Sequence, residues 1–227
     1  MYSFAQRDDT RIVDEPLYGH YLHVTGVGHP GGDEVIATMN CDGDAVLRAM
    51  MAQSEASPGT HYFVKHMAHH LVQLDMQFVA KCRNVFLIRD PREMLPSLTI
   101  QVPQATLADT GLMKQWQLLE DLRSQGQTVT VLDSRELLTN PEAVLRTLCA
   151  QLQIPFQESM LRWSAGPRNE DGVWAKHWYQ AVHKSTGFAA YQPKDIFPTQ
   201  LQALLDECLP WYDKLFALAI RAPQHGD

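Results

Sequence analysis

Four short apolar runs with strand spacing recur along the chain, and longer stretches with helical spacing separate them. The runs are TRIV (10–13), HYFVK (61–65, with the strand itself over 62–65), NVFLI (84–88) and TVTVL (128–132). The third run is apolar on both faces, as expected of a buried parallel strand. The 112–122 stretch between the third and fourth runs has helical periodicity. Strand, helix, strand in that order predicts parallel pairing through crossover helices.

Helical periodicity also marks the intervals around these strands. We predict helices over 43–53 and over 139–152, the latter with Asn140 as its cap and Pro141 in its first turn. A last helix follows residues 197–198, and the opening letters MYSFAQR have helical spacing as well. By contrast, the interval from Tyr18 to Met39 is rich in glycine, which predicts a loop or mobile segment and not packed structure. Such a loop could cover a ligand.

The pattern predicts one α/β domain over residues 1–227, in three layers with a mostly parallel sheet flanked by helices. A length of 227 residues suits one substantial core. We expect all four strands to lie in a single sheet. Ligands in open α/β sheets bind at the carboxyl ends of the strands, so functional residues are sought there.

The composition of the chain argues against several classes of function. The net charge of −7 gives no support for non-specific nucleic-acid binding. No apolar stretch is long enough to cross a membrane, and the start lacks the apolar segment of a signal peptide, so we expect a cytoplasmic protein without a membrane partner. The four cysteines form no CxxC pair, and Cys149 and Cys208 fall on apolar helix faces, where buried structural thiols are expected.

The stretch NVFLIRDPREMLPSL (84–98) carries the clearest candidate binding site. Its strand places Arg89 at the carboxyl end, and a helix begins at once with Asp90 as its cap. Backbone N–H groups, the helix dipole and a guanidinium together favour a phosphate at this point. The simpler interpretation is that Arg89 only pairs with Asp90 or Glu93.

The spacing R-D-P-x-x-x-x-x-S, from Arg89 to Ser97, resembles the 3′-phosphate-binding motif of sulfotransferases. A second stretch, VLDSRELLTNPEAVLRTLCAQLQIPFQESMLRW (131–163), is similar to the corresponding region of that family, and the resemblance covers most of the chain. It implies a P-loop NTPase-like fold and the donor 3′-phosphoadenosine 5′-phosphosulfate, with Arg89 and Ser97 on its 3′-phosphate. No metal is expected.

The resemblance also implies catalytic candidates. Lys65 ends its strand, as a lysine often does in the family's K-x-H-like segment, and Glu15 is similar to a carboxylate that follows the second strand in several bacterial members. Glu15 could accept the proton of an acceptor hydroxyl, although a solvated or capping Glu-Pro corner is the alternative. Asp14 should point to the other side of an extended strand. The histidine of the family's segment is displaced here, so His66 is not assigned as the base.

Two further patterns have weaker support. His66 and His70 have the spacing of a helical zinc pair, but no HExxH glutamate lies between them, which argues against zinc. The stretch GVWAKHWYQAVHKSTGF (172–188) could close over the nucleotide with Lys184, or its aromatic residues could simply pack in the core.

The function implied is transfer of a sulfuryl group from 3′-phosphoadenosine 5′-phosphosulfate to a hydroxyl or amine of a small molecule. The family's first strand and Ser/Gly-rich phosphate loop have no counterpart in this sequence, so we expect a truncated fold that lacks them. Two alternatives remain open: a catalytically incompetent remnant that binds a nucleotide or a partner, and a relative of P-loop kinases. A kinase should carry a GK[ST] loop.

Overall fold

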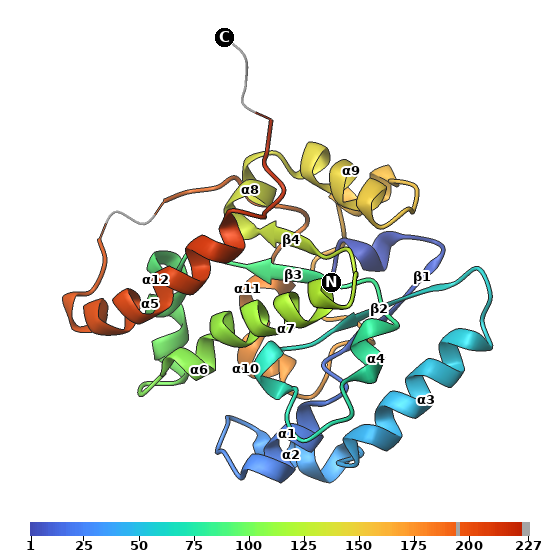
Figure 1. Ribbon diagram of the computed structural model, residues 1–227, viewed down its shortest axis with the longest axis horizontal. Coiled ribbons are helices and arrows are strands. Elements are labelled where there is room, and N and C mark those ends of the chain that lie inside the picture. Colours follow the sequence, from blue (N-terminus) through green and yellow to red (C-terminus); the bar gives the residue numbers. More distant parts are fainter. Residues whose placement is uncertain (194–195, 224–227) are drawn as a thin grey trace. The chain divides into compact units, whose positions relative to one another are not determined.

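The computed structural model describes residues 1–193 and 196–223 (Figure 1). The chain divides into two compact units, which are described one at a time. The first unit comprises Met1–Phe78 and Gln157–Phe188, and the second comprises Val79–Phe156 and Ala189–Asp227. The single domain over 1–227 therefore stays a prediction.

A pair of parallel strands forms the centre of the first unit. Strand β1 (Thr10–Asp14) pairs with β2 (His61–Lys65), and the register sets Thr10 beside His61 and Asp14 beside Lys65. The connection between them runs through helices α1 (Tyr18–Thr25), α2 (Gly32–Thr38) and α3 (Gly43–Glu55). Because the strands are parallel and in register, both carboxyl ends, and the charged residues on them, meet at one edge.

The predicted loop over Tyr18–Met39 is wrong, because most of this interval forms helices α1 and α2. Its glycines end and begin these helices: Gly26 caps the end of α1 at φ 67° and Gly31 precedes α2 at φ 75°. Leu22 and Val35 are buried, and the two helices pack against each other. The glycine density therefore marks helix ends and not an open loop.

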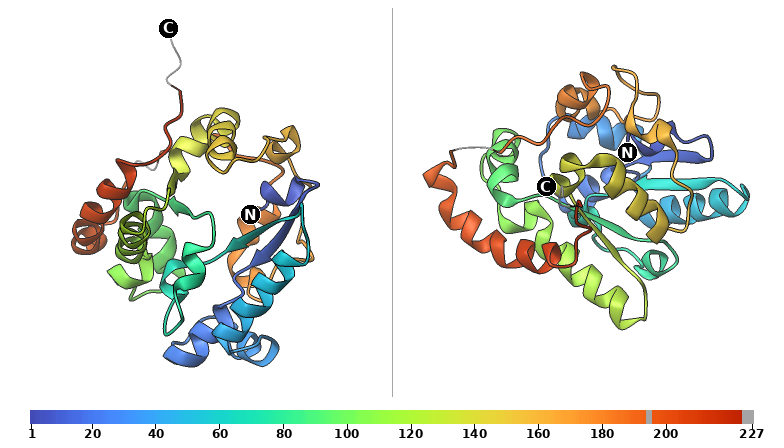
Figure 2. Two further views of the ribbon diagram at one scale, coloured as in Figure 1. Left: turned by 45° about the vertical axis from the view of Figure 1, so that its right-hand side comes forward. Right: turned by 90° about the horizontal axis from the view of Figure 1, so that it is seen from above.

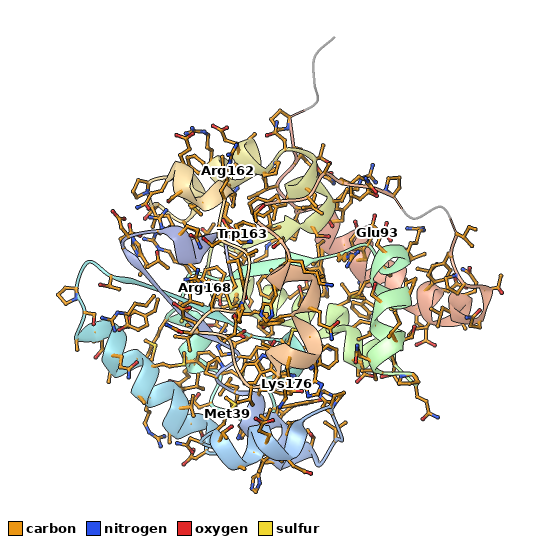
Figure 3. All side chains as sticks on the ribbon, turned by 180° about the vertical axis from the view of Figure 1, so that it is seen from behind. Met39, Glu93, Arg162, Trp163, Arg168 and Lys176 are labelled. Carbon is orange, nitrogen blue, oxygen red and sulfur yellow. The ribbon has the colours of Figure 1, made fainter. Side chains whose placement is uncertain are left out.

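The late segment of the chain completes the first unit. It contains the 3-10 helix η3 (Glu158–Leu161) and the short helices α10 (Ala175–Trp178) and α11 (Gln180–His183). The indole of Trp163 donates a hydrogen bond to the Ser185 hydroxyl at 2.9 Å, which ties the two ends of the segment together. Figure 3 labels Trp163, and it also labels Lys176, whose ammonium pairs with Glu34 on α2.

The predicted helix over 43–53 is confirmed as α3, where the Asp42 side chain accepts a hydrogen bond from the Ala45 N–H at 2.9 Å. The opening helix is confirmed only as a single 3-10 turn, η1 (Phe4–Gln6). The remaining elements up to the start of the second unit are η2 (Ala68–His70) and α4 (Gln77–Ala80).

A second parallel pair forms the centre of the second unit. Strand β3 (Val85–Ile88) pairs with β4 (Thr130–Asp133), with Val85 beside Thr130 and Ile88 beside Asp133. The surrounding elements are α5 (Pro91–Gln101), α6 (Leu107–Thr110), α7 (Leu112–Ser124), α8 (Ser134–Thr139), α9 (Pro141–Gln151), η4 (Thr199–Leu201) and α12 (Gln202–Phe216). Helix α12 packs against α7 and α5 (Figure 2).

The helices predicted in this unit are confirmed. The Asn140 side chain accepts from the Ala143 N–H at 3.1 Å at the start of α9, and Pro141 follows it. Cys149 on α9 and Cys208 on α12 are both buried, as their apolar helix faces indicated. Asp133, fully buried at the end of β4, caps α8 and accepts a hydrogen bond from the Tyr212 hydroxyl at 3.1 Å.

The α/β class with parallel strands flanked by helices is confirmed. The strands nevertheless form two two-stranded sheets and not the single four-stranded sheet expected. The hydrogen-bonded ladders join β1 with β2 and β3 with β4, and within the described part of the chain no ladder joins β2 to β3. Within the described part of the chain, no helix is both long and apolar enough to cross a membrane.

Candidate functional site

The carboxyl ends of β1 and β2 bring two carboxylates and one ammonium together. Lys65, the last residue of β2, lies beside Asp14 in the ladder, and the Glu15 N–H donates to the Lys65 carbonyl at 2.9 Å. The Lys65 ammonium donates to the Glu15 carboxylate and lies 3.3 Å from Asp14 Oδ1. The structure therefore places the two predicted catalytic residues, Glu15 and Lys65, in direct contact.

Asp14 also contacts Lys65, which corrects the expectation that it points to the other side of the strand. Successive side chains alternate only while the backbone stays extended. The strand ends at Asp14, and Glu15 has a φ of 40°, in the left-handed region that a residue with a side chain rarely adopts. This turn lets the two adjacent carboxylates reach the same ammonium.

The three charged groups differ in their access to solvent. The Asp14 side chain is fully buried, that of Glu15 is 9% exposed and that of Lys65 is 29% exposed. Burial raises the pKa of Glu15 and outweighs the opposing effect of Lys65. Burial alone would lower the pKa of Lys65, but the Glu15 carboxylate, with Tyr179 and Asp14, raises it. Lys65 is therefore a cation at neutral pH, and Glu15 has a raised proton affinity.

His70 contacts the other oxygen of the Glu15 carboxylate. Its Nδ1 lies 3.5 Å from Glu15 Oε2, and its ring stacks on Tyr18 and on Tyr21 with centroid distances of 4.8 and 4.3 Å. Tyr18 and Tyr21 come from α1, one turn apart on the same helix. The stacked rings fix the imidazole plane beside the carboxylate and shield it from water.

The zinc interpretation of His66 and His70 has no support in the structure. The two residues do not share an α-helix, because His66 follows the end of β2 and His70 ends the short η2. Among the described residues there is no group of three or more histidine, cysteine, aspartate or glutamate side chains that could hold a metal ion. The Nδ1 atom of His66 is buried and has no hydrogen-bond partner within the described part of the chain.

Acid is expected to destabilise the fold through the buried histidines. Burial lowers the pKa of His70 to about 2 and that of His66 to about 4, whereas an unfolded histidine titrates near 6.5. Below pH 6.5 the unfolded chain therefore binds protons that the folded chain does not. As the pH is lowered below 6.5, the free energy of unfolding should therefore decrease by up to about 1.4 kcal/mol per pH unit for each histidine.

This prediction can be checked by urea unfolding of the wild type and of His70→Gln between pH 6.5 and 4.5. The free energy of unfolding of the variant should decrease less per pH unit than that of the wild type, because unfolding of the variant no longer allows position 70 to bind a proton. Glu15 has the opposite effect on stability, because its raised pKa lets the folded chain bind a proton at a higher pH than the unfolded chain does. This effect is present in both proteins. An unchanged slope in His70→Gln would contradict the assignment.

Arg89 follows β3 in the second unit, as the sequence predicted. Asp90 caps α5 by accepting from the Arg92 N–H at 2.8 Å, and Pro91 occupies the first helical position. The Arg89 side chain is 45% exposed, and its Nε lies 3.6 Å from Glu93 Oε2. The ion pair of the simpler interpretation is therefore present, while the exposed guanidinium retains donors that can reach a ligand.

The other two residues predicted to bind the nucleotide are exposed. Ser97 lies on α5, directly after Pro96 within that helix, and Lys184 follows α11 in the first unit. Arg89 and Ser97 thus belong to one unit and Lys184 to the other. The common role of Arg89 and Ser97 at the 3′-phosphate, and the place of Lys184 near the nucleotide, stay predictions.

The charged cluster consists of Asp14, Glu15, Lys65, His70 and Tyr179. Two of these residues were not predicted from the sequence to belong to it. Tyr179 is hydrogen-bonded to Asp14 and Lys65, although it lies 165 residues after Asp14 in the sequence. His70, in the turn after β2, contacts Glu15. The aromatic stretch 172–188 was noted, but only Lys184 within it was taken as a candidate site residue. Hydrogen bonds between residues so far apart leave no local pattern in a single sequence.

Comparison with known proteins decides the family. The model of the sulfotransferase domain family matches residues 1–219. The chain belongs to this family. The family assignment from the Arg89 motif and from the 131–163 stretch is thereby confirmed.

Two curated relatives of this sulfotransferase-family chain come from Arabidopsis thaliana. The branched-chain-amino-acid aminotransferase-like protein 2 is 41% identical over 219 residues, which are 95% of this chain and 38% of the relative. The branched-chain-amino-acid aminotransferase-like protein 1 is 42% identical over 219 residues, covering 95% of this chain and 39% of the relative. The chain therefore spans about two fifths of the length of these relatives.

Two solved structures are also similar. The sulfotransferase domain from the curacin biosynthetic pathway has a TM-score of 0.46 and 15% identity, covering 84% of this chain and 77% of that one. The sulfotransferase domain from the Synechococcus PCC 7002 olefin synthase has a TM-score of 0.41 and 15% identity, covering 84% of this chain and 74% of that one.

Proposed function

We propose that the chain takes part in the transfer of a sulfuryl group from 3′-phosphoadenosine 5′-phosphosulfate to a hydroxyl or amine of a small molecule. The family assignment supports the reaction class. The observation that carries the proposal is the contact between Glu15 and Lys65 at the carboxyl ends of β1 and β2. A carboxylate and an ammonium in contact, both partly shielded from water, are the groups that this transfer needs.

In the proposed step, Glu15 acts as the general base. The acceptor oxygen or nitrogen attacks sulfur, the bond from sulfur to the bridging oxygen of the donor breaks, and the acceptor's proton passes to Glu15. A base works best when its pKa lies near the operating pH, and burial moves the pKa of Glu15 upward in that direction. Lys65, held as a cation, stabilises the negative charge that develops on the bridging oxygen.

Arg89 and Ser97 are proposed to bind the 3′-phosphate of the donor, and Lys184 to add positive charge near the nucleotide. An exposed guanidinium at the start of a capped helix can form charge-assisted hydrogen bonds with a phosphate. Glu93 would then orient Arg89, since the two side chains form an ion pair. The Glu93 carboxylate itself also accepts a hydrogen bond from the Tyr191 hydroxyl, which holds it in place.

Removal of the Arg89 guanidinium is expected to weaken nucleotide binding selectively. Arg89→Ala should lose about 1.5–3 kcal/mol of binding free energy for 3′-phosphoadenosine 5′-phosphate, the magnitude of a charged hydrogen bond. Binding of adenosine 5′-phosphate, which lacks the 3′-phosphate, should hardly change. Isothermal titration of both nucleotides measures the difference.

Arg92→Ala is the matched control for this experiment. Arg92 lies three residues further along, in the first turn of α5, is 54% exposed and pairs with Asp90, so its loss removes the same charge close to the same helix start. It should leave the discrimination between the two nucleotides intact. Equal losses for both nucleotides in Arg89→Ala, or the same selectivity loss in Arg92→Ala, would contradict the proposed 3′-phosphate site.

A further inference from the structure

Tyr179 belongs to the charged cluster but has no role in the proposed reaction. It lies between α10 and α11, and its hydroxyl donates to the Asp14 carboxylate, with distances of 2.9 Å to Oδ1 and 2.8 Å to Oδ2. The same oxygen accepts a hydrogen bond from the Lys65 ammonium at 2.8 Å. Tyr179 therefore bridges the most buried carboxylate and the most exposed charge of the cluster.

The donors of Lys65 are fully used by this arrangement. An ammonium has three N–H donors. The described contacts supply three acceptors, namely Glu15, the Tyr179 hydroxyl and, at the longer distance of 3.3 Å, Asp14. No donor is left for a ligand, so Lys65 must release one partner before it can bind an anion. Asp14 is the weakest of the three contacts.

Loss of the contact between the Lys65 ammonium and Asp14 would be costly if the Asp14 carboxylate had no other hydrogen-bond donor. Its side chain is fully buried, and a buried charge without a partner is strongly unfavourable. The Tyr179 hydroxyl already lies within hydrogen-bond distance of both Asp14 oxygens, so the carboxylate stays paired when the ammonium turns away. The side chain of Lys65 is partly exposed and can turn toward a ligand.

We propose that Tyr179 is a positioning residue that keeps Asp14 hydrogen-bonded and so lets Lys65 give one donor to a tetrahedral oxyanion. The identity of that oxyanion as the sulfuryl group of the donor rests on the proposed function. The hydrogen-bond exchange itself requires only the described contacts among Tyr179, Asp14 and Lys65.

Sulfate is the probe that tests the exchange. Lysine side-chain NMR signals of the labelled chain are followed during titration with sodium sulfate, with sodium chloride at equal ionic strength as the control. In the wild type the Lys65 signal should shift and saturate. Tyr179→Phe keeps the ring but removes the hydroxyl, so among the described contacts Asp14 is left with the Lys65 ammonium alone and holds it turned away from a ligand. Although one Lys65 donor loses its acceptor, sulfate should therefore bind about 10- to 100-fold more weakly, as expected for the loss of a hydrogen bond to a charged group.

Asp14→Asn separates positioning from a merely structural role. Without the Asp14 charge, Lys65 is no longer held, so this variant should bind sulfate at least as tightly as the wild type. In the Asp14→Asn background, Tyr179→Phe should change the sulfate affinity by less than about threefold, because the two residues act as one unit. Should Tyr179→Phe not fold, the affinity of Asp14→Asn alone still tests the proposal.

Four results would overturn the proposal: a Lys65 signal that sulfate does not move in the wild type, an unchanged affinity in Tyr179→Phe, an equal loss from Tyr179→Phe in both backgrounds, or weaker sulfate binding by Asp14→Asn than by the wild type. Failure of the proposed function has a different signature. Sulfate binding would then follow the expected pattern, but no sulfuryl group would be transferred from 3′-phosphoadenosine 5′-phosphosulfate.

Discussion

Lys65→Met is expected to lower the free energy of unfolding by about 3–5 kcal/mol at pH 7, the magnitude found when one partner of a buried ion pair is removed. The substitution keeps the length and most of the volume of the side chain but leaves Asp14 and Glu15 as neighbouring buried carboxylates without a cation. Chemical denaturation of the wild type and the variant at pH 7 measures the loss.

The loss should depend on the two carboxylates. Adding Glu15→Gln to Lys65→Met removes one of the uncompensated charges, so the double variant should be more stable than Lys65→Met alone. A surface pair supplies the control: Lys176→Met removes the partner of Glu34, and exposed pairs contribute about 0–1 kcal/mol. Equal losses for Lys65→Met and Lys176→Met would contradict the importance assigned to the buried cluster.

Glu15→Gln is expected to slow sulfuryl transfer by about 10²- to 10⁴-fold, the range for loss of a general base. Glutamine has nearly the same shape and can still accept a hydrogen bond from Lys65, so the fold should be retained. It cannot take up the acceptor's proton. The rate is measured with whichever acceptor takes up label from ³⁵S-labelled 3′-phosphoadenosine 5′-phosphosulfate.

Glu34→Gln serves as the matched control, because it neutralises an exposed carboxylate of the same unit that also pairs with a lysine. Its rate should stay close to that of the wild type. If Glu15→Gln retained the wild-type rate while the wild type was active, Glu15 would not be the base. The buried imidazole of His66, next to Lys65, would then be the first alternative to test.

Local patterns in the sequence were sufficient to predict most elements of the fold. The α9 helix was predicted from Asn140, Pro141 and an apolar stripe, all of which act within one or two turns. The helix after Arg89 followed in the same way from Asp90 and Pro91. Capping and periodicity are short-range effects, so a single sequence contains them.

The interval from Tyr18 to Met39 shows where such reasoning fails. Its glycines were taken as a sign of a loop, yet Gly26 and Gly31 only end and begin helices whose apolar residues are buried by other segments. Burial by distant segments outweighed the local tendency of glycine to loosen the chain. The α1 helix matters for the site, because its tyrosines stack on His70.

The charged cluster was predicted only in part, for a similar reason. Glu15 and Lys65 were identified as ends of strands, but strand alternation wrongly made Asp14 the less favoured candidate. The left-handed conformation of Glu15 is a property of a single residue at the end of β1, and no periodic pattern signals it. Tyr179 joins the cluster through contacts with residues more than a hundred positions away.

The measurement that tests the proposed function most directly is a transfer assay with the wild-type chain. The chain is incubated with ³⁵S-labelled 3′-phosphoadenosine 5′-phosphosulfate and a panel of small alcohols, phenols and amines. We expect label to appear in an organic product, with release of an equal amount of 3′-phosphoadenosine 5′-phosphate and inhibition when that nucleotide is added in excess. Binding of the nucleotide without any transfer of label across the panel would contradict the proposed sulfuryl transfer.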